Sequence, residues 1–205
     1  MDFRTLLNAP GFVRLDGAMG TMLQRKGLPV GKAPELAGLE HPDWLLEIHR
    51  AYLAAGAQIA TANTFGASAL KLAGTGCTPE AVIAANVGLA RQAVGNRALV
   101  ALDIGPLGQL LEPTGTLRFD EAYDCFARMV RAGAKAGADL VLLETMTDLY
   151  EVKAALLAVK ENSSLPVICT MTFEDNRRTF LGCDIPSMAL TLEGLGADAI
   201  GVNCS

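Results

Sequence analysis

One short phrase occurs three times along this chain, each time between a helix-like segment and an apolar run. The copies are Ala55-Gly56-Ala57, Ala136-Gly137-Ala138 and Leu195-Gly196-Ala197. Glycine directly after a helix is a common C-terminal cap, and an apolar strand follows each copy at once. The recurrence predicts a repeated helix–strand turn, and therefore a chain that is built from repeated βα units.

The remaining pattern alternates between strands and helices. Six strands are predicted near residues 12–16, 58–61, 98–102, 140–143, 166–171 and 199–202. Five helices are predicted near residues 44–55, 78–94, 120–136, 149–160 and 186–195. Several strands are continuous apolar runs, which is typical of parallel strands buried on both faces. The pattern indicates an α/β fold, either a doubly wound sheet or a TIM barrel.

Polar residues at the strand ends favour the barrel. Those at the C-terminal ends of the predicted strands are Asp16, Asn63, Thr64, Asp103, Glu144, Thr172, Asn203 and Cys204. In a TIM barrel this rim is the mouth of the active site. A doubly wound sheet instead uses one switch point and a glycine-rich phosphate loop, which Gly17-Ala18-Met19-Gly20 does not match.

The length of the chain limits how much of a barrel it can form. A TIM (β/α)8-type barrel has eight strands and typically about 250 residues. Six strands are predicted within the 205 residues. The helix that should cover the sixth strand is missing. We expect residues 1–205 to be a single barrel domain that is incomplete, truncated after strand six.

Composition excludes several classes of partner. Net charge is −5, from 17 basic and 22 acidic residues, and no Lys/Arg cluster suggests a nucleic-acid interface. No apolar run approaches the roughly 18 residues of a membrane span, and the N-terminus lacks the apolar core of a signal peptide. The 5 cysteines show no CxxC spacing, which fits a reducing, cytoplasmic location.

Three strand-end residues could carry chemistry. Cys204 could be a buried thiol, a nucleophile or a metal ligand, and one cysteine alone does not make a zinc site. Asp16 and Glu144 each follow an apolar run directly, where a carboxylate can bind an ammonium group, act as acid or base, or hold a metal. Asp16-Gly17 is also a strong turn pair.

For other polar residues, a purely structural role is an alternative to a functional one. Asn63 and Thr64 could bind a substrate carboxylate or simply cap their loop. Asp103 could belong to a structural turn, and His49 looks like a structural helix residue. A barrel lyase or aldolase would need a lysine at a strand end, whereas the lysines fall in predicted loops and helices.

Five motifs taken together carry a family resemblance. They are Leu15–Thr21, Thr61–Gly66, Asp103–Pro106, Glu144-Thr145 and Gly201–Ser205. In order and spacing they resemble the homocysteine S-methyltransferase family. The resemblance covers the whole chain and is closest to the N-terminal homocysteine-binding module of cobalamin-dependent methionine synthase.

The resemblance implies a TIM barrel and a specific site. In the family, three cysteines hold Zn²⁺, one after strand six and two in a Gly-Gly-Cys-Cys-Gly motif near strand eight. Cys204 matches the first, and the 205 residues do not contain the adjacent pair. Asp16 and Glu144 match the residues that bind the amino group of homocysteine. Gly17, Ala18, Asn63 and Thr64 would lie near the amino-acid end of the substrate.

The implied reaction is transfer of a methyl group to the sulfur of homocysteine, giving methionine. The expected donor is methylcobalamin, carried on another module of a longer parent protein that also has a folate-binding module. Betaine or S-methylmethionine as donor, and a non-catalytic truncated barrel remnant, are the alternatives. With one of three zinc ligands, the 205-residue chain alone is expected to be inactive and to bind zinc poorly.

Overall fold

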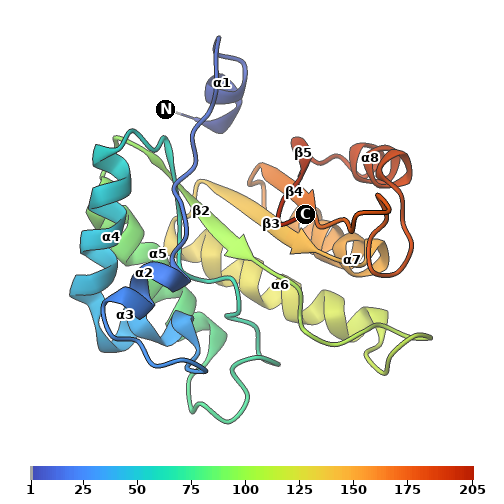
Figure 1. Ribbon diagram of the computed structural model, residues 1–205, viewed down its shortest axis with the longest axis horizontal. Coiled ribbons are helices and arrows are strands. Elements are labelled where there is room, and N and C mark those ends of the chain that lie inside the picture. The colour runs from blue at the N-terminus through green and yellow to red at the C-terminus, as the bar shows by residue number, and fades with distance from the viewer. Residues whose placement is uncertain (1) are drawn as a thin grey trace.

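The structure, a computed structural model, describes residues 2–205 and contains one parallel sheet (Figure 1). The strands are β1 Ile59–Thr61, β2 Leu99–Ile104, β3 Leu140–Met146, β4 Val167–Met171 and β5 Ala199–Val202. They lie in the order β1-β2-β3-β4-β5, and every neighbouring pair is parallel. Sequential order is the topology of a βα barrel, whereas a doubly wound sheet reverses its order. Within residues 2–205, β1 and β5 do not pair, so the barrel is not closed.

All five predicted helices are present. They are α4 Pro42–Ala54, α5 Pro79–Val94, α6 Phe119–Ala136, α7 Leu149–Asn162 and α8 Ile185–Gly194. Four short elements were not predicted: α1 Phe3–Leu7, α2 Gly20–Arg25, α3 Ala37–Glu40 and the 3-10 helix η1 Pro34–Leu36. These are only three to six residues long, too short to show a helical period in the sequence.

The first of the six predicted strands is wrong as a strand. Leu15 makes only an isolated parallel bridge to Ile59, next to a hydrogen bond of 3.0 Å from the Asp16 N–H to the Ile59 carbonyl. The segment therefore lies along the edge of β1, and its backbone hydrogen bonds to that strand end at Asp16. Phe12, at its other end, is 92% exposed. The sheet of the described residues thus has five strands.

Alternate side chains of the strands point to two different cores. Val100, Leu102 and Val141 face outward and pack with the long helices in the main cluster. Inward-facing side chains form a second cluster with two residues of α1: Phe3, Leu6, Ile59, Leu99, Ala101, Leu140 and Leu142. Apolar side chains thus fill the inner face near the start of the strands, and the polar residues lie toward the strand ends.

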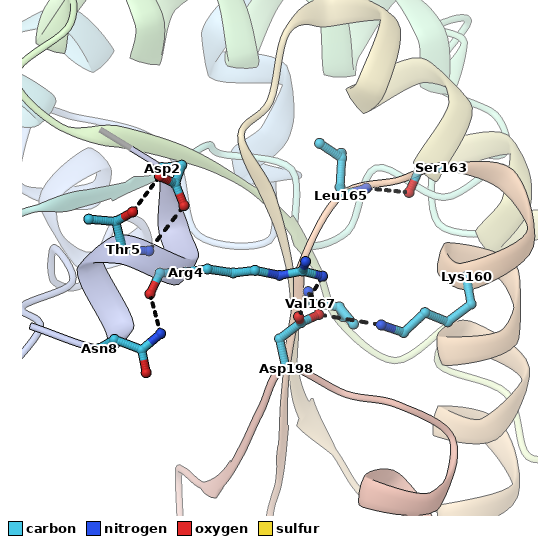
Figure 2. Close-up of polar contacts among 9 residues, drawn as sticks. All are labelled: Asp2, Arg4, Thr5, Asn8, Lys160, Ser163, Leu165, Val167 and Asp198. Atoms are coloured by element: carbon cyan, nitrogen blue, oxygen red, sulfur yellow. Dashed lines mark hydrogen bonds and ion pairs between the residues drawn. The ribbon is translucent and has the colours of Figure 1, made fainter.

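Helix α1 is held over this inner face by an ion pair with Asp198 (Figure 2). The Arg4 guanidinium lies 3.3 Å from one carboxylate oxygen of Asp198. The other oxygen accepts hydrogen bonds from Lys160 Nζ at 3.3 Å and from the Val167 N–H at 3.0 Å. Asp198 therefore ties the N-terminal helix to β4 and α7, and the inner cluster is covered at that end.

No helix among residues 2–205 combines the length and the apolar character that crossing a bilayer requires.

A buried carboxyl, Glu151, links the loop after β2 to the first turn of α7. Its Oε1 accepts a hydrogen bond of 2.7 Å from the Leu107 N–H. Burial, with a smaller contribution from Asp148, raises the pKa of Glu151 from 4.5 to about 7, although the Leu107 N–H and Lys71 oppose the shift. The group thus takes up its charge only near neutral pH.

The raised pKa of Glu151 predicts that the free energy of unfolding decreases as the pH rises. Its folded pKa lies above the unfolded value, so its stabilising contribution is complete below pH 4.5 and is lost as the pH rises through about 7. Between about pH 5 and 8, the free energy of unfolding should therefore decrease more in the wild type than in Glu151→Gln. We expect the two decreases to differ by about 2–3 kcal/mol. Urea unfolding at both pH values measures it, with exposed Glu193→Gln as control. An equal fall in wild type and Glu151→Gln would contradict the assignment.

Candidate active site

A cavity of about 590 Å³ lies at the C-terminal ends of the strands. Six of the seven residues predicted for the site line it: Asp16, Gly17, Ala18, Asn63, Glu144 and Cys204. They come from segments far apart in the sequence, and parallel strands bring them to one rim. The seventh, Thr64, does not line the cavity. It is fully buried, and its hydroxyl donates to the Asp103 carbonyl at 2.8 Å and accepts from the Asp103 N–H at 3.0 Å.

Asp16 serves both the fold and the cavity. Its side chain is 3% exposed, and its Oδ2 accepts a hydrogen bond of 2.9 Å from the Thr61 N–H at the end of β1. The same oxygen lies 3.8 Å from Nδ1 of His49 on α4. The sequence interpretation of His49 as a purely structural helix residue missed this contact. His49 is fully buried behind Asp16, and neither ring nitrogen has a hydrogen-bond partner among residues 2–205.

Two further carboxyls, Glu144 and Asp103, face the same space from β3 and β2. Burial raises the pKa of Glu144, and the charge of Asp16 raises it further. The pKa of Asp103 lies well above its usual range because it is buried, and Glu144, Asp16 and Glu35 add to the shift. The three strand-end acids thus repel one another, and the cavity favours a cationic group.

Glu35, just after Pro34 in η1, is a cavity residue that the sequence analysis missed. It is 6% exposed, and its Oε1 accepts a hydrogen bond of 2.7 Å from the Gly66 N–H. The Asn63 side-chain amide donates to the Pro34 carbonyl at 2.7 Å, which fixes η1 against the end of β1. Because η1 is only three residues long, no periodic pattern marked Glu35 as buried.

Gly17 is required by a close approach. A Cβ at this position would lie 2.9 Å from the Tyr52 ring. The Tyr52 hydroxyl donates a hydrogen bond of 2.9 Å to the Ala18 carbonyl, so α4 holds the loop against the cavity. Any larger side chain at Gly17 would push Tyr52 or the loop aside.

Cys204 lies at the mouth of the cavity, beside the end of β3. Its thiol is exposed, and its Sγ is within 3.8 Å of the Thr145 hydroxyl and 3.7 Å of the Asn203 amide. The Asn203 side chain also accepts from the Thr145 N–H at 3.1 Å. Thr145 and Cys204 have φ of +60° and +53°, which L residues rarely adopt. Such backbone strain is concentrated at functional sites, and here two cases lie side by side, with the Thr145 hydroxyl 3.8 Å from the Cys204 Sγ.

The metal that the resemblance implies fits only in part. An exposed thiol at the mouth of an acidic cavity is a suitable Zn²⁺ ligand. Residues 2–205 contain no group of three or more His, Cys, Asp and Glu side chains that could hold a metal ion. Cys204 can therefore supply one ligand, and the described residues do not complete a zinc site.

Two curated proteins are similar to this chain over most of its length. The methionine synthase of Mycobacterium leprae is 31% identical over 209 residues, which cover 93% of this chain and 17% of that protein. The homocysteine S-methyltransferase of Escherichia coli is 29% identical over 222 residues, which cover 98% of this chain and 72% of that protein. The chain thus spans about a sixth of the methionine synthase and most of the shorter enzyme.

Solved structures give the same result. The crystal structure of the metallated homocysteine methyltransferase MmuM from Escherichia coli superposes with a TM-score of 0.88 at 26% identity, over 98% of this chain and 77% of that one. This confirms the expected TIM-barrel type of fold. The profile of the family described as homocysteine S-methyltransferase matches residues 13–205. The chain therefore belongs to the homocysteine S-methyltransferase family.

Proposed function

We propose that this chain is the homocysteine-binding part of an enzyme that transfers a methyl group to the sulfur of homocysteine, forming methionine. The observation that carries the proposal is the cavity in which Asp16 and Glu144 face inward and the Cys204 thiol lies at the mouth. Homocysteine carries both a cationic ammonium group and a sulfur atom, and this cavity is lined by both carboxylates and a cysteine thiol. Residues 1–205 would act as a single substrate-binding domain.

We assign the amino-acid end of the substrate to the part of the cavity that Asp16 and Glu144 line. Asp16 and Glu144 would hold the ammonium group, which is the only cation of homocysteine. The loop of Gly17 and Ala18 and the Asn63 amide, which line the same cavity, would contact the substrate carboxylate. Thr64 would act indirectly, because its hydroxyl is already bonded to the Asp103 backbone. Holding this end in place orients the sulfur toward the mouth.

The sulfur end is assigned to Cys204 and a metal. We infer that Cys204 is one of the cysteine ligands of a catalytic Zn²⁺ and that the other ligands lie outside residues 1–205. A free thiol with a pKa near 8.5 is mostly protonated at neutral pH, and a bound zinc ion would supply a deprotonated, nucleophilic sulfur. Thr145 and Asn203 would keep the Cys204 thiol at the mouth.

The donor and the partners stay predictions. Similarity to a methionine synthase supports methylcobalamin on another module of a longer protein, together with a folate-binding module. Similarity to the Escherichia coli homocysteine S-methyltransferase keeps S-methylmethionine or betaine as alternative donors. The cytoplasmic location rests only on the five cysteines without a disulfide framework. A non-catalytic remnant is favoured by one observation, that residues 2–205 hold no complete metal site.

Ligand binding tests the proposed function. Calorimetric titration of the 205-residue protein with homocysteine is expected to show binding. Titration with 4-mercaptobutyrate, which differs only by lacking the amino group, is expected to show much weaker binding or none. Equal binding of the two ligands, or no binding of either, would contradict the proposal that Asp16 and Glu144 bind the amino group of the substrate.

The 205-residue protein is expected to bind zinc weakly. It offers Cys204 as a single strand-end ligand, whereas a catalytic zinc site uses three protein ligands. Zinc content after dialysis against a chelator should be well below one ion per chain, and homocysteine methylation should be undetectable. Tight stoichiometric zinc that survives the chelator would contradict the assignment of Cys204 as one part of a larger ligand set.

A further inference from the structure

Asp103 is a buried acid of the cavity with no assigned task. Its residue is 6% exposed, it lines the cavity, and its Oδ1 has no hydrogen-bond partner among residues 2–205. An unpartnered buried carboxyl oxygen costs free energy unless a ligand or water satisfies it. The sequence alone suggested that Asp103 belongs to a structural turn. In the structure, the Thr64 hydroxyl holds this part of the backbone.

Thr64 does the structural work at this position. Its hydroxyl bonds both the N–H and the carbonyl of Asp103, so the end of β2 is fixed through the backbone. The backbone contact to Thr64 would be the same with any side chain at residue 103. The carboxyl group is therefore free to act in the cavity.

The groups around Asp103 are mostly negative. Glu144 on β3, Asp16 beside β1 and Glu35 in η1 all disfavour its charged form. On the positive side, Lys71 in the loop after β1 senses the charge of Asp103, and His49 on α4 lies behind Asp16. Burial and the three acids together raise the pKa of Asp103 and so favour its protonated form, whereas a cation bound among these acids would favour the charged form.

We propose that Asp103 is a third carboxyl contact for the ammonium group of the amino-acid substrate, and that it releases its proton to solvent when that group binds. The proposal rests on the proposed function and adds a residue that sets specificity for the amino group. The step is balanced: the ammonium keeps its protons, the Asp103 O–H bond breaks, and the buffer takes up one proton.

Methionine is the suitable probe, because it has the amino-acid end of homocysteine and no thiol that could lose a proton. Calorimetric titration in two buffers of different ionisation enthalpy, at about pH 6.5, gives the number of protons released per ligand. The wild-type protein is expected to release a measurable fraction of a proton for each methionine bound. It should also bind methionine more tightly than 4-(methylthio)butanoate, the analogue without the amino group. Asp103→Asn should release fewer protons and bind methionine about tenfold more weakly.

The controls separate the two proposals. Asp103→Ser provides a second variant if the asparagine is poorly packed, and Glu193→Gln removes an exposed acid far from the cavity. Selective binding by wild type with unchanged affinity and proton release in both Asp103 variants overturns the role of Asp103 and leaves the proposed function intact. Failure of wild type to bind either amino acid overturns both. A purely structural Asp103 would lower thermal stability without changing the number of protons released.

Discussion

Replacing Cys204 by alanine is expected to abolish zinc-dependent methylation of homocysteine in the assembled enzyme. The exposed thiol lines the same cavity as the acids assigned to the substrate amino group. Losing one of three protein ligands removes both metal affinity and the orientation of the metal. Zinc content and methionine formation, measured on the same preparations, should fall together to background.

The backbone at Cys204 makes alanine a clean substitution. The residue has a φ of +53°, and alanine and cysteine both carry a Cβ, so the strain is the same in both proteins. Cys77→Ala is the matched control, because this half-buried thiol precedes α5 and does not line the cavity. Normal zinc content and turnover in Cys204→Ala, or equal losses in Cys77→Ala, would exclude Cys204 as a specific ligand.

The strand ends were predictable from the sequence for a physical reason. Asp16, Asn63 and Glu144 follow apolar runs, and parallel strands carry such residues to one rim whatever their separation along the chain. The ends of three of the five helices, α4, α6 and α8, were predictable for a similar reason, since a glycine of the repeated phrase follows each of them within two residues. The rule for strand ends alone predicted four of the site residues that line the cavity, Asp16, Asn63, Glu144 and Cys204, whereas Gly17 and Ala18 were expected there only from the family resemblance.

The missed residues depend on contacts that no local pattern encodes. Glu35 is buried because the Gly66 N–H, 31 residues further on, bonds to it. His49 occupies a buried position of an ordinary amphipathic helix, and only the fold reveals that Asp16 is 3.8 Å from its ring. The segment of residues 12–16 has strand-like residues, but its pairing with β1 is limited to one isolated bridge at Leu15, and its backbone hydrogen bonds to β1 end at Asp16.

Glu144→Gln is expected to weaken homocysteine binding by about ten- to a hundredfold, the usual cost of losing one hydrogen bond to a charged group. Because the pKa of Glu144 is raised, wild-type affinity should also fall as the pH drops through that raised value, since the protonated acid no longer attracts the ammonium. The pH dependence should be smaller in the variant. Calorimetric titration across about pH 5–8 measures both effects, and exposed Glu193→Gln is the control.

Stability separates a binding role for Glu144 from a structural one. Among residues 2–205 no donor hydrogen-bonds to the Glu144 carboxyl, whereas Asp16 accepts from the Thr61 N–H at 2.9 Å. Glu144→Gln should therefore keep or raise the free energy of unfolding at neutral pH, because it removes a half-buried acid whose pKa is raised and whose charging is therefore unfavourable. Asp16→Ala should lose both homocysteine affinity and roughly 1–3 kcal/mol of stability, because the half-buried Thr61 N–H is left without its acceptor. If Glu144→Gln unfolded as readily as Asp16→Ala and still bound homocysteine normally, Glu144 would be part of the scaffold, and the ammonium group would have to be held by the remaining acids of the cavity.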